Sequence, residues 1–325
     1  TDWQAGGEYT YTVSLATARG YIIEDDGSYT VYNADGLMNI AELVNGGKTD
    51  INITLDTDID LTGKDWTPIG TDYDNSYKGT FDGGGHTITG LTFTTNDEFA
   101  GLFGWLNRAG TVKNVVMEGV QITSNQIYGG SIGGVVGSSW GTIENCSVSG
   151  SVSGTNCVGG VVGSQKAGSI IGCSSSAIVK GTHYVGGVAG EKWGTMTACY
   201  ATGNVTLEIN SPQDLSGGGV VGLNGGSTVH ACYATGNVNS KGRSTGNVHI
   251  GGLFGDNYTA VTACYWKNNH EQGIGYSNKV TEATKVDGSV VTWQEAVDAM
   301  NTVLQNAGSK WRYELTGALP TLRKQ

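Results

Sequence analysis

The sequence predicts an all-β fold, a parallel β-helix in which each coil of a solenoid is one sequence repeat. Three observations support this prediction. A glycine-bounded tetrapeptide recurs at a nearly constant spacing, a second element follows each copy, and the residues after that element alternate with a period of two. Self-similarity at a fixed period is the signature of a repeat architecture.

The first repeated element is a tetrapeptide with glycine at both ends and apolar residues between them. Its closing glycines are spaced by 33, 26, 27, 32 and 33 residues. The six copies are residues 101–104, 134–137, 160–163, 187–190, 219–222 and 252–255. The second element ends on cysteine in five copies and on Val115 in the first. Coils of this length suit a β-helix better than a propeller, the alternative, whose repeats usually take about 40–50 residues.

The residues after each cysteine alternate as a strand with one buried face requires. After Cys199, the small or apolar residues Ala201 and Val205 alternate with the polar residues Thr202 and Asn204. Glycine at this density would destabilise a helix by about 1 kcal/mol per residue.

Stacked coils should bring equivalent residues into columns at a spacing of about 4.8 Å. We expect one inward column at Leu102, Val135, Val161, Val188, Val220 and Leu253, and another at Val115, Cys146, Cys173, Cys199, Cys232 and Cys264. Five cysteines at one apolar repeat position predict buried free thiols. Cys157 occupies the position of Tyr184 in the next copy and is expected near a turn, with its thiol or disulfide state left open.

The regions outside the repeats are expected to be caps, because open solenoid ends expose unpaired strand edges. A short helix is predicted near residues 35–46, with Asp35 as its N-cap, and a second at 293–307, begun by a capping box of Thr292 and Glu295. Either helix is expected to lie against an end of the stack. We divide the chain into a strand of an upstream module at 1–20, an N-terminal cap and first coils at 21–100, repeats at 101–275 and a C-terminal cap at 276–325.

Composition and charge narrow the classes of partner. The net charge of −11, with only 18 Lys and Arg, argues against nucleic acid. No run of about 18 apolar residues is present, so this segment is not expected to enter a membrane. The first residues lack a basic and then apolar signal pattern, so an export signal is expected to be removed already or never present. We expect a monomer without a cofactor.

Aromatic residues supply the candidate ligand-binding positions. Three residues after each closing glycine stand Trp140, Lys166, Trp193, Gly225 and Tyr258, which should line one edge of the stack. A second column, Tyr200, Tyr233 and Tyr265, is predicted on the outer strand face. These rings could stack on sugars. Alternatively, they cover turns, with the Lys166 ammonium between the rings of Trp140 and Trp193.

Acidic residues raise two further alternatives. Asp56, Asp58 and Asp60 alternate along one predicted strand, a pattern that fits either a solvated face or a calcium site. A polysaccharide lyase or hydrolase would need paired carboxylates on neighbouring coils. The repeats supply Glu118, Glu144, Glu191, Glu208, Asp214 and Asp256, which we place at unmatched repeat positions.

The repeat as a whole resembles the GLUG motif. Residues 187–205 and 219–238 match it closely, and Trp66–Gly70 and Phe81–Ile88 look like the lead-in found in the same surface proteins. The resemblance implies a right-handed β-helix of a bacterial surface or secreted protein, such as an adhesin or the stalk of an IgA-cleaving metallopeptidase. The zinc motif of those peptidases is missing, because His270-Glu271 is followed by Ile274 rather than a second histidine. Residues 3–11 are similar to the closing strand of fimbrillin-like adhesin domains.

These observations together predict a non-catalytic protein of the extracellular or bacterial outer surface. We expect an adhesin or stalk that presents a rigid repeat surface to a host or microbial glycan or protein. The alternatives are a carbohydrate-active β-helix enzyme and a structural spacer without a ligand.

Overall fold

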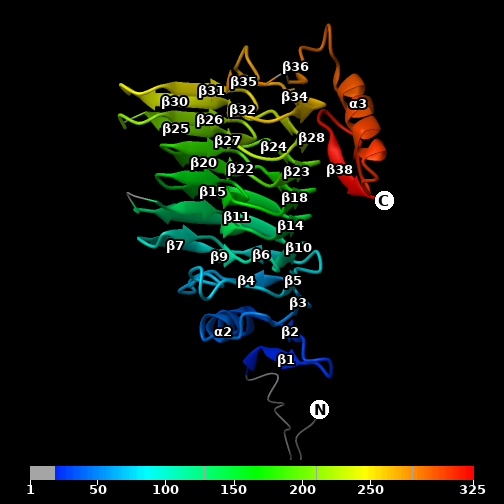
Figure 1. The fold of residues 1–325 in the computed structure, drawn as a ribbon. Helices are drawn as coiled ribbons and strands as arrows, with labels where there is room; N and C mark the ends of the chain where they lie inside the picture. Colours follow the sequence, from blue (N-terminus) through cyan, green and yellow to red (C-terminus); the bar gives the residue numbers. More distant parts are fainter. Residues whose placement is uncertain (1–18, 127–128, 210, 280) are drawn as a thin grey trace, which may run out of the picture.

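The computed structural model describes residues 19–126, 129–209, 211–279 and 281–325. The predicted strand near residues 9–15 and the fimbrillin-like resemblance lie outside these residues. The described chain winds into a solenoid of stacked coils (Figure 1), and sequential coils pair through parallel strands. The all-β prediction of a parallel β-helix is confirmed.

Each coil of the repeat region contributes strands to four sheets, met along the chain in the order A, B, D, C. Sheet A contains β1 (Tyr21–Ile23), β2 (Tyr29–Val31), β3 (Ile53–Leu55), β5 (Thr80–Asp82), β10 (Thr111–Lys113), β14 (Thr142–Glu144), β18 (Ser169–Ile171), β23 (Thr195–Thr197), β28 (Val229–His230) and β33 (Val261–Thr262). Its β1–β2 pair is antiparallel and lies at the N-terminal end of the stack (Figure 1).

Sheet B is the longest and carries the alternating strands that follow the cysteines. It contains β4 (Ile59–Asp60), β6 (Thr87–Thr89), β7 (Thr92–Thr95), β11 (Val116–Ser124), β15 (Ser147–Ser153), β19 (Ser174–Ser175), β20 (Ile178–Gly181), β24 (Tyr200–Ala201), β25 (Val205–Ile209), β29 (Tyr233–Ala234), β30 (Val238–Gly242), β34 (Cys264–Trp266) and β36 (Ala283–Lys285).

The glycine tetrapeptides join the remaining two sheets. Sheet D contains β8 (Phe99–Ala100), β12 (Ser131–Gly133), β16 (Cys157–Gly159), β21 (Tyr184–Gly186), β26 (Leu215–Gly218) and β31 (Val248–Gly251). Sheet C contains β9 (Phe103–Leu106), β13 (Val136–Ser139), β17 (Val162–Gln165), β22 (Ala189–Lys192), β27 (Val221–Asn224), β32 (Phe254–Asn257) and β35 (Ile274–Ser277).

Both predicted inward columns are confirmed. The N–H groups of Val135, Val161 and Val188 donate to the carbonyl of the next member of their column at 2.9–3.0 Å. Every member of the two columns is buried, and all of them belong to one continuous apolar core. Longer repeats keep this register because their extra residues lie between sheets B and D. Two residues separate β20 from β21, whereas five separate β25 from β26.

The five cysteines of the column are confirmed as free thiols, Cys157 is also free, and all six are buried. Cys157 begins β16 and pairs in register with Tyr184, as predicted. Directly before the cysteine column, each coil turns from sheet A to sheet B at one residue with positive φ. This conformation is strained for most side chains but is visited by asparagine and glycine. The turn residues are Asn114, Asn145, Gly172, Ala198, Ala231 and Ala263.

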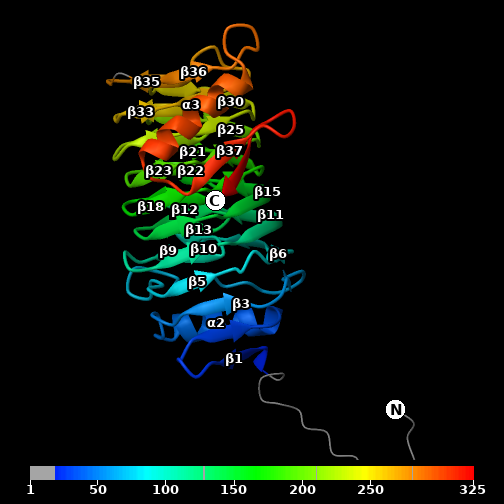
Figure 2. The ribbon, with the colours of Figure 1, turned by 90° about the vertical axis from the view of Figure 1, so that its right-hand side faces the viewer.

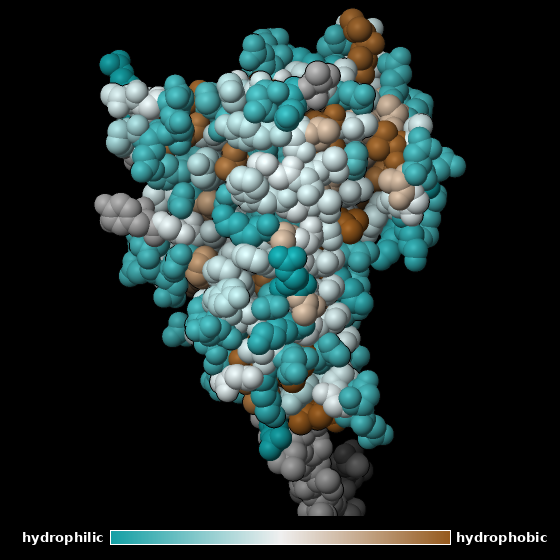
Figure 3. Space-filling view, viewed as in Figure 1, coloured by the Kyte–Doolittle hydropathy of each residue, from teal (hydrophilic) through white to brown (hydrophobic). Residues whose placement is uncertain are grey.

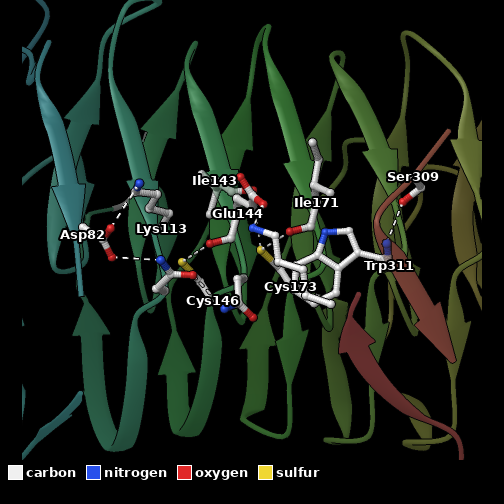
Figure 4. A network of polar contacts seen from close by, with 12 residues as sticks. Asp82, Lys113, Ile143, Glu144, Cys146, Ile171, Cys173, Ser309 and Trp311 are labelled. Carbon is white, nitrogen blue, oxygen red and sulfur yellow. Dashed lines mark hydrogen bonds and ion pairs between the residues drawn. The ribbon is translucent and has the colours of Figure 1, made fainter. Parts of the chain in front are cut away.

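Side chains at this corner form a ladder where asparagine is present. The Asn145 side chain donates to Asn114 Oδ1 at 2.8 Å, and Asn114 donates to Asp82 Oδ1 at 2.8 Å. Asp82 also pairs with Lys113 at 3.1 Å (Figure 4). The polar ladder therefore caps the turn of the coils that carry asparagine.

Helix α2 (Ala34–Asn45) lies near the N-terminal end of the stack (Figure 1) and buries the apolar face predicted for it. Its N-cap is Asn33, so the prediction of Asp35 is wrong. Asn33 is extended and its side chain accepts from Gly36 N at 2.9 Å. Asp35 instead lies in the first turn and pairs with Lys64 at 2.6 Å.

Helix α3 (Trp293–Asn306) begins with the predicted capping box of Thr292 and Glu295. The expectation that α3 covers an end of the stack is wrong. Together with the antiparallel hairpin of β37 (Trp311–Glu314) and β38 (Thr321–Lys324), it lies against the flank of several coils (Figures 1 and 2). We call α3 and this hairpin the C-terminal lobe.

The C-terminal lobe covers the corner where the turn residues are short. Ala198, Ala231 and Ala263 belong to one apolar cluster with the buried face of α3 and the hairpin, and Tyr313 Oη donates to the Ala231 carbonyl at 2.9 Å. Trp311 lies over Gly172, where a Cβ atom would come within 2.5 Å of the indole ring. A flat apolar strip on the flank therefore explains the position of the lobe. The division of the chain into domains stays a prediction.

Candidate functional site

The predicted edge of aromatic residues forms one register-matched column, which we call the aromatic edge. Its members, in coil order, are Trp140, Lys166, Trp193, Gly225 and Tyr258. In each of the last four members, the backbone N–H donates to a backbone carbonyl of the preceding coil at 2.8–2.9 Å. The acceptor is the residue directly before that coil's own member of the column. The rings are thus two coils apart, roughly 10 Å.

The rings of the aromatic edge differ in accessibility. Trp193 is 43% exposed and Tyr258 is 39% exposed, whereas Trp140 is half-buried. The Arg108 guanidinium lies 5.3 Å from the Trp140 ring centroid. The Lys166 ammonium instead pairs with the Glu191 carboxylate at 2.5 Å. The alternative in which Lys166 lies between the rings is therefore wrong.

Behind the aromatic edge, the outward side chains of sheets D and C meet. Phe99 on β8 and Trp105 on β9 are in edge-to-face contact at 4.5 Å, and Ser216 on β26 donates to Asp256 on β32. These positions are buried or half-buried, and they lie outside the apolar core. These side chains form one column on each of the two sheets, and we call the two columns together the crease. They are Ser131, Cys157, Tyr184, Ser216 and His249 on sheet D, and Ser138, Ser164, Glu191, Leu223 and Asp256 on sheet C.

Glu191 is the centre of a polar network in the crease. It is 7% exposed and accepts hydrogen bonds from Ser164 Oγ at 2.8 Å, Lys166 Nζ at 2.5 Å and Trp193 Nε1 at 2.6 Å. Burial acts to raise the pKa of Glu191, but Lys166, Trp193 and Ser164 together hold that pKa below its ordinary value. The carboxylate is therefore ionised and fully engaged, and it fixes the Trp193 ring.

Asp256 occupies the same column two coils further on. Its carboxylate lies 2.6 Å from His249 Nδ1, and Tyr276 stacks on the His249 ring at 5.1 Å. Sheet C aligns Glu191 with Leu223 and Leu223 with Asp256, so the two carboxylate-bearing positions are roughly 10 Å apart. The prediction that acidic residues stand at unmatched positions is wrong for this pair. A signal was present, since each residue directly follows a closing glycine.

The tyrosine column is confirmed in register but is only partly accessible. The rings of Tyr200 and Tyr233 stack with centroids 4.8 Å apart and planes 2° from parallel. Tyr233 is 1% exposed, and its hydroxyl donates to the Pro320 carbonyl in the C-terminal lobe at 2.5 Å. Tyr233 is therefore wrong as a ligand-binding residue, because the lobe covers it. Tyr200 is half-buried and lines a cavity of about 240 Å³ with several serines.

The prediction that Asp56, Asp58 and Asp60 alternate along one strand is wrong, because Asp56 and Asp58 lie between β3 and β4 and only Asp60 belongs to a strand. Asp56, Asp58 and Asp60 are exposed, and Asp58 Oδ1 accepts from the backbone of Thr87 at 2.9 Å. Leu55, on the opposite face, is buried. Within the described parts of the chain, no three histidine, cysteine or acidic side chains gather in a way that could hold a metal ion.

The comparisons with known proteins agree with the repeat. The family model "The GLUG motif" matches residues 128–153. Halomucin of Haloquadratum walsbyi is 32% identical over 185 residues, which cover 50% of this chain and 2% of halomucin. A protein of Evansella cellulosilytica, described as a Gly-rich membrane protein, is 33% identical over 129 residues, which cover 37% of this chain and 14% of that protein. The chain therefore spans only a small part of either relative.

A solved structure matches almost the whole chain. It is a protein described as a candidate immunoglobulin A1 protease of Bacteroides ovatus, with a TM-score of 0.69 and 21% identity, covering 92% of this chain and 93% of that one. At this identity the likeness shows the fold alone. Among the described residues, no helix is long and apolar enough to cross a membrane. The chain thus carries the GLUG motif on a β-helix and is similar to proteins named as mucin and membrane proteins.

Proposed function

We propose that the chain is a non-catalytic part of a cell-surface protein, an adhesin or stalk whose β-helix presents the aromatic edge to a glycan. The observation that carries this proposal is the exposure of Trp193 and Tyr258 on a rigid stack. Large apolar side chains are costly to leave in water, and these two are held in place. Trp193 is oriented by its bond to Glu191, and Tyr258 lies 6.0 Å from the Tyr276 ring.

The surface presents separate exposed rings rather than one broad apolar patch. On the face shown in Figure 3, hydrophilic and near-neutral residues predominate and apolar residues are scattered. Trp193 and Tyr258 are two coils apart, with only Gly225 between them. A Cβ atom on Gly225 would come within 2.8 Å of the Trp193 indole, so the ring packs over this glycine and only its solvent-facing surface could contact a sugar.

The rival function, a carbohydrate-active enzyme, is favoured by the alignment of Glu191 with Asp256. A roughly 10 Å separation is close to the upper limit for an inverting glycosidase. Yet a general acid needs a pKa near the working pH, and the pKa of Glu191 is lowered instead. Both carboxylates also contact internal partners rather than open space. We therefore place them as supports of the crease.

The proposal is tested by glycan-array binding of the whole chain and of a Trp193→Ala, Tyr258→Ala double variant. Loss of the two rings should abolish binding of the preferred glycan. Tyr32→Ala is the matched control, because Tyr32 is also 39% exposed but directly follows β2, at the N-terminal end of the stack and far from the aromatic edge in sequence. Binding that survives the double variant would overturn the aromatic edge as the binding site, and absence of binding in the parent chain would leave the spacer function in place of the adhesin.

The enzyme alternative has its own assay. Release of reducing ends or unsaturated products is measured for the same glycans with the parent chain and with Glu191→Gln. Turnover that disappears in Glu191→Gln would show that the crease is catalytic and would contradict our proposal.

A further inference from the structure

We propose a second ligand site on sheet B, a serine-lined trough that takes a neutral carbohydrate against the free face of Tyr200. The inference rests on the proposed glycan-binding function and extends it to a different surface. The trough is the cavity of about 240 Å³ lined by residues of β11, β15, β19 and β24. This volume lies just below the range of about 300–1,000 Å³ usual for small-molecule sites.

The trough exists because one column changes from large to small side chains. Sheet B aligns Tyr233, Tyr200, Ser174 and Ser147 in successive coils. One face of the Tyr200 ring is stacked on Tyr233. Its other face looks along the column toward Ser174, whose short side chain cannot cover a ring. Tyr200 is thus a ready aromatic wall, held flat by Tyr233, which the C-terminal lobe buries.

The floor of the trough offers free hydroxyl groups. Within the described residues, the hydroxyls of Ser147 and Ser174 make no hydrogen bond to the protein, and Ser176 Oγ makes only a long contact of 3.5 Å to the Val148 carbonyl. Ser149 Oγ is partly engaged, because it accepts from Gly119 N at 3.1 Å and lies 3.5 Å from the Met117 carbonyl. A serine hydroxyl both donates and accepts. A row of such groups beside an aromatic face matches a sugar, whose hydroxyls need both kinds of partner and whose C–H face packs on a ring.

The charge at the trough favours neutral sugars over acidic ones. Glu118 is exposed at the rim of the trough and has no ion-pair partner among the described residues. The lining holds no lysine or arginine, and the chain carries a net charge of −11. A uronic or sialic acid would therefore meet only like charge, while a neutral sugar could donate to the Glu118 carboxylate.

The test is titration calorimetry of the full chain with neutral trisaccharides (cellotriose, maltotriose, chitotriose and mannotriose) and with trigalacturonic acid. We expect one or more neutral probes to bind and the acidic probe not to bind. Tyr200→Ala should weaken binding by about threefold to tenfold, whereas Tyr200→Phe keeps the ring and should bind like the parent. Ser174→Leu places a larger side chain against the free face of Tyr200, fills the trough and should abolish binding.

The outcomes separate this site from the aromatic edge. Binding that is lost in Ser174→Leu but kept in the Trp193→Ala, Tyr258→Ala variant supports the trough. Binding with the reverse pattern overturns the trough and leaves the aromatic edge standing. Absence of binding by every neutral probe, or equal binding of trigalacturonic acid, also overturns it. Glu118→Gln should admit the acidic probe, and its failure to do so would refute the charge argument.

Discussion

Lys192 makes the stability of this protein depend on pH near neutrality. Its side chain is fully buried in a column of polar residues inside the solenoid. The ammonium donates to Asn224 Oδ1 at 2.7 Å and to the Ser227 carbonyl, and no carboxylate pairs with it among the described residues. Burial lowers the pKa of Lys192 to about 7, although the nearby thiols of Cys232 and Cys264 act in the opposite direction.

The sign and size of the effect follow from this pKa. In the unfolded chain the ammonium stays protonated to its ordinary pKa of 10.5, so between pH 7 and 10.5 the unfolded state binds more protons than the folded state. The free energy of unfolding must therefore rise with pH over this interval. The whole shift corresponds to about 5 kcal/mol as an upper limit, of which about 1 kcal/mol falls between pH 6 and pH 8.

The measurement is urea unfolding at pH 6, 7 and 8 under reducing conditions, followed by tryptophan fluorescence. Lys192→Met should lose the rise of about 1 kcal/mol that the parent shows. Lys241→Met, at an exposed lysine, should keep it. The buried thiols of Cys146 and Cys264, whose pKa is raised, act with the opposite sign, but only as the pH approaches the ordinary thiol pKa of 9.0, above this interval. Parallel pH profiles for the parent and Lys192→Met would refute a buried, largely desolvated ammonium.

Two further predictions test the columns and the flank. A thiol reagent such as Ellman's should label none of the six cysteines in the native chain and all six in denaturant, because every thiol is buried; rapid native labelling would contradict the inward column. Gly172→Ala should destabilise the protein by about 1–3 kcal/mol, since φ is positive there and the new Cβ meets Trp311. Ala198→Gly, at the same turn position one coil on, should change urea stability far less, and equal losses would show that Trp311 does not rest on Gly172.

The columns could be predicted because each repeat carries the same local signals. Val161 and Val188 each lie between glycines, and Cys173 and Cys199 each end the same short element. Once strands stack in parallel, backbone hydrogen bonds bring such equivalents into line whatever the loop lengths are. The register therefore depended on information within about 30 residues, which the sequence displays directly.

The position of the C-terminal lobe could not be predicted in this way. Its contacts join residues far apart in the sequence, such as Tyr313 and Ala231, and nothing in the periodicity of α3 says which apolar surface it covers. The burial of Tyr233 could not be predicted for the same reason, because the C-terminal lobe covers it. The alignment of Glu191 with Asp256, by contrast, could have been predicted from the sequence, because each residue directly follows a closing glycine.

The turn residues explain in retrospect where the lobe packs and hence where the trough begins. Asparagine at the corner places its side-chain amide in a hydrogen-bonded ladder, as Asn114 and Asn145 do. Covering such a ladder with the apolar C-terminal lobe would bury polar amides, which is costly. Alanine at the same turn has no such groups, and it accepts backbone strain while offering a flat apolar strip. The lobe accordingly covers the coils of Ala198 and Ala231. It buries Tyr233 but leaves one face of Tyr200 open. The ligand surface that we propose on sheet B is thus a consequence of a change in residue type at a corner that no ligand contacts.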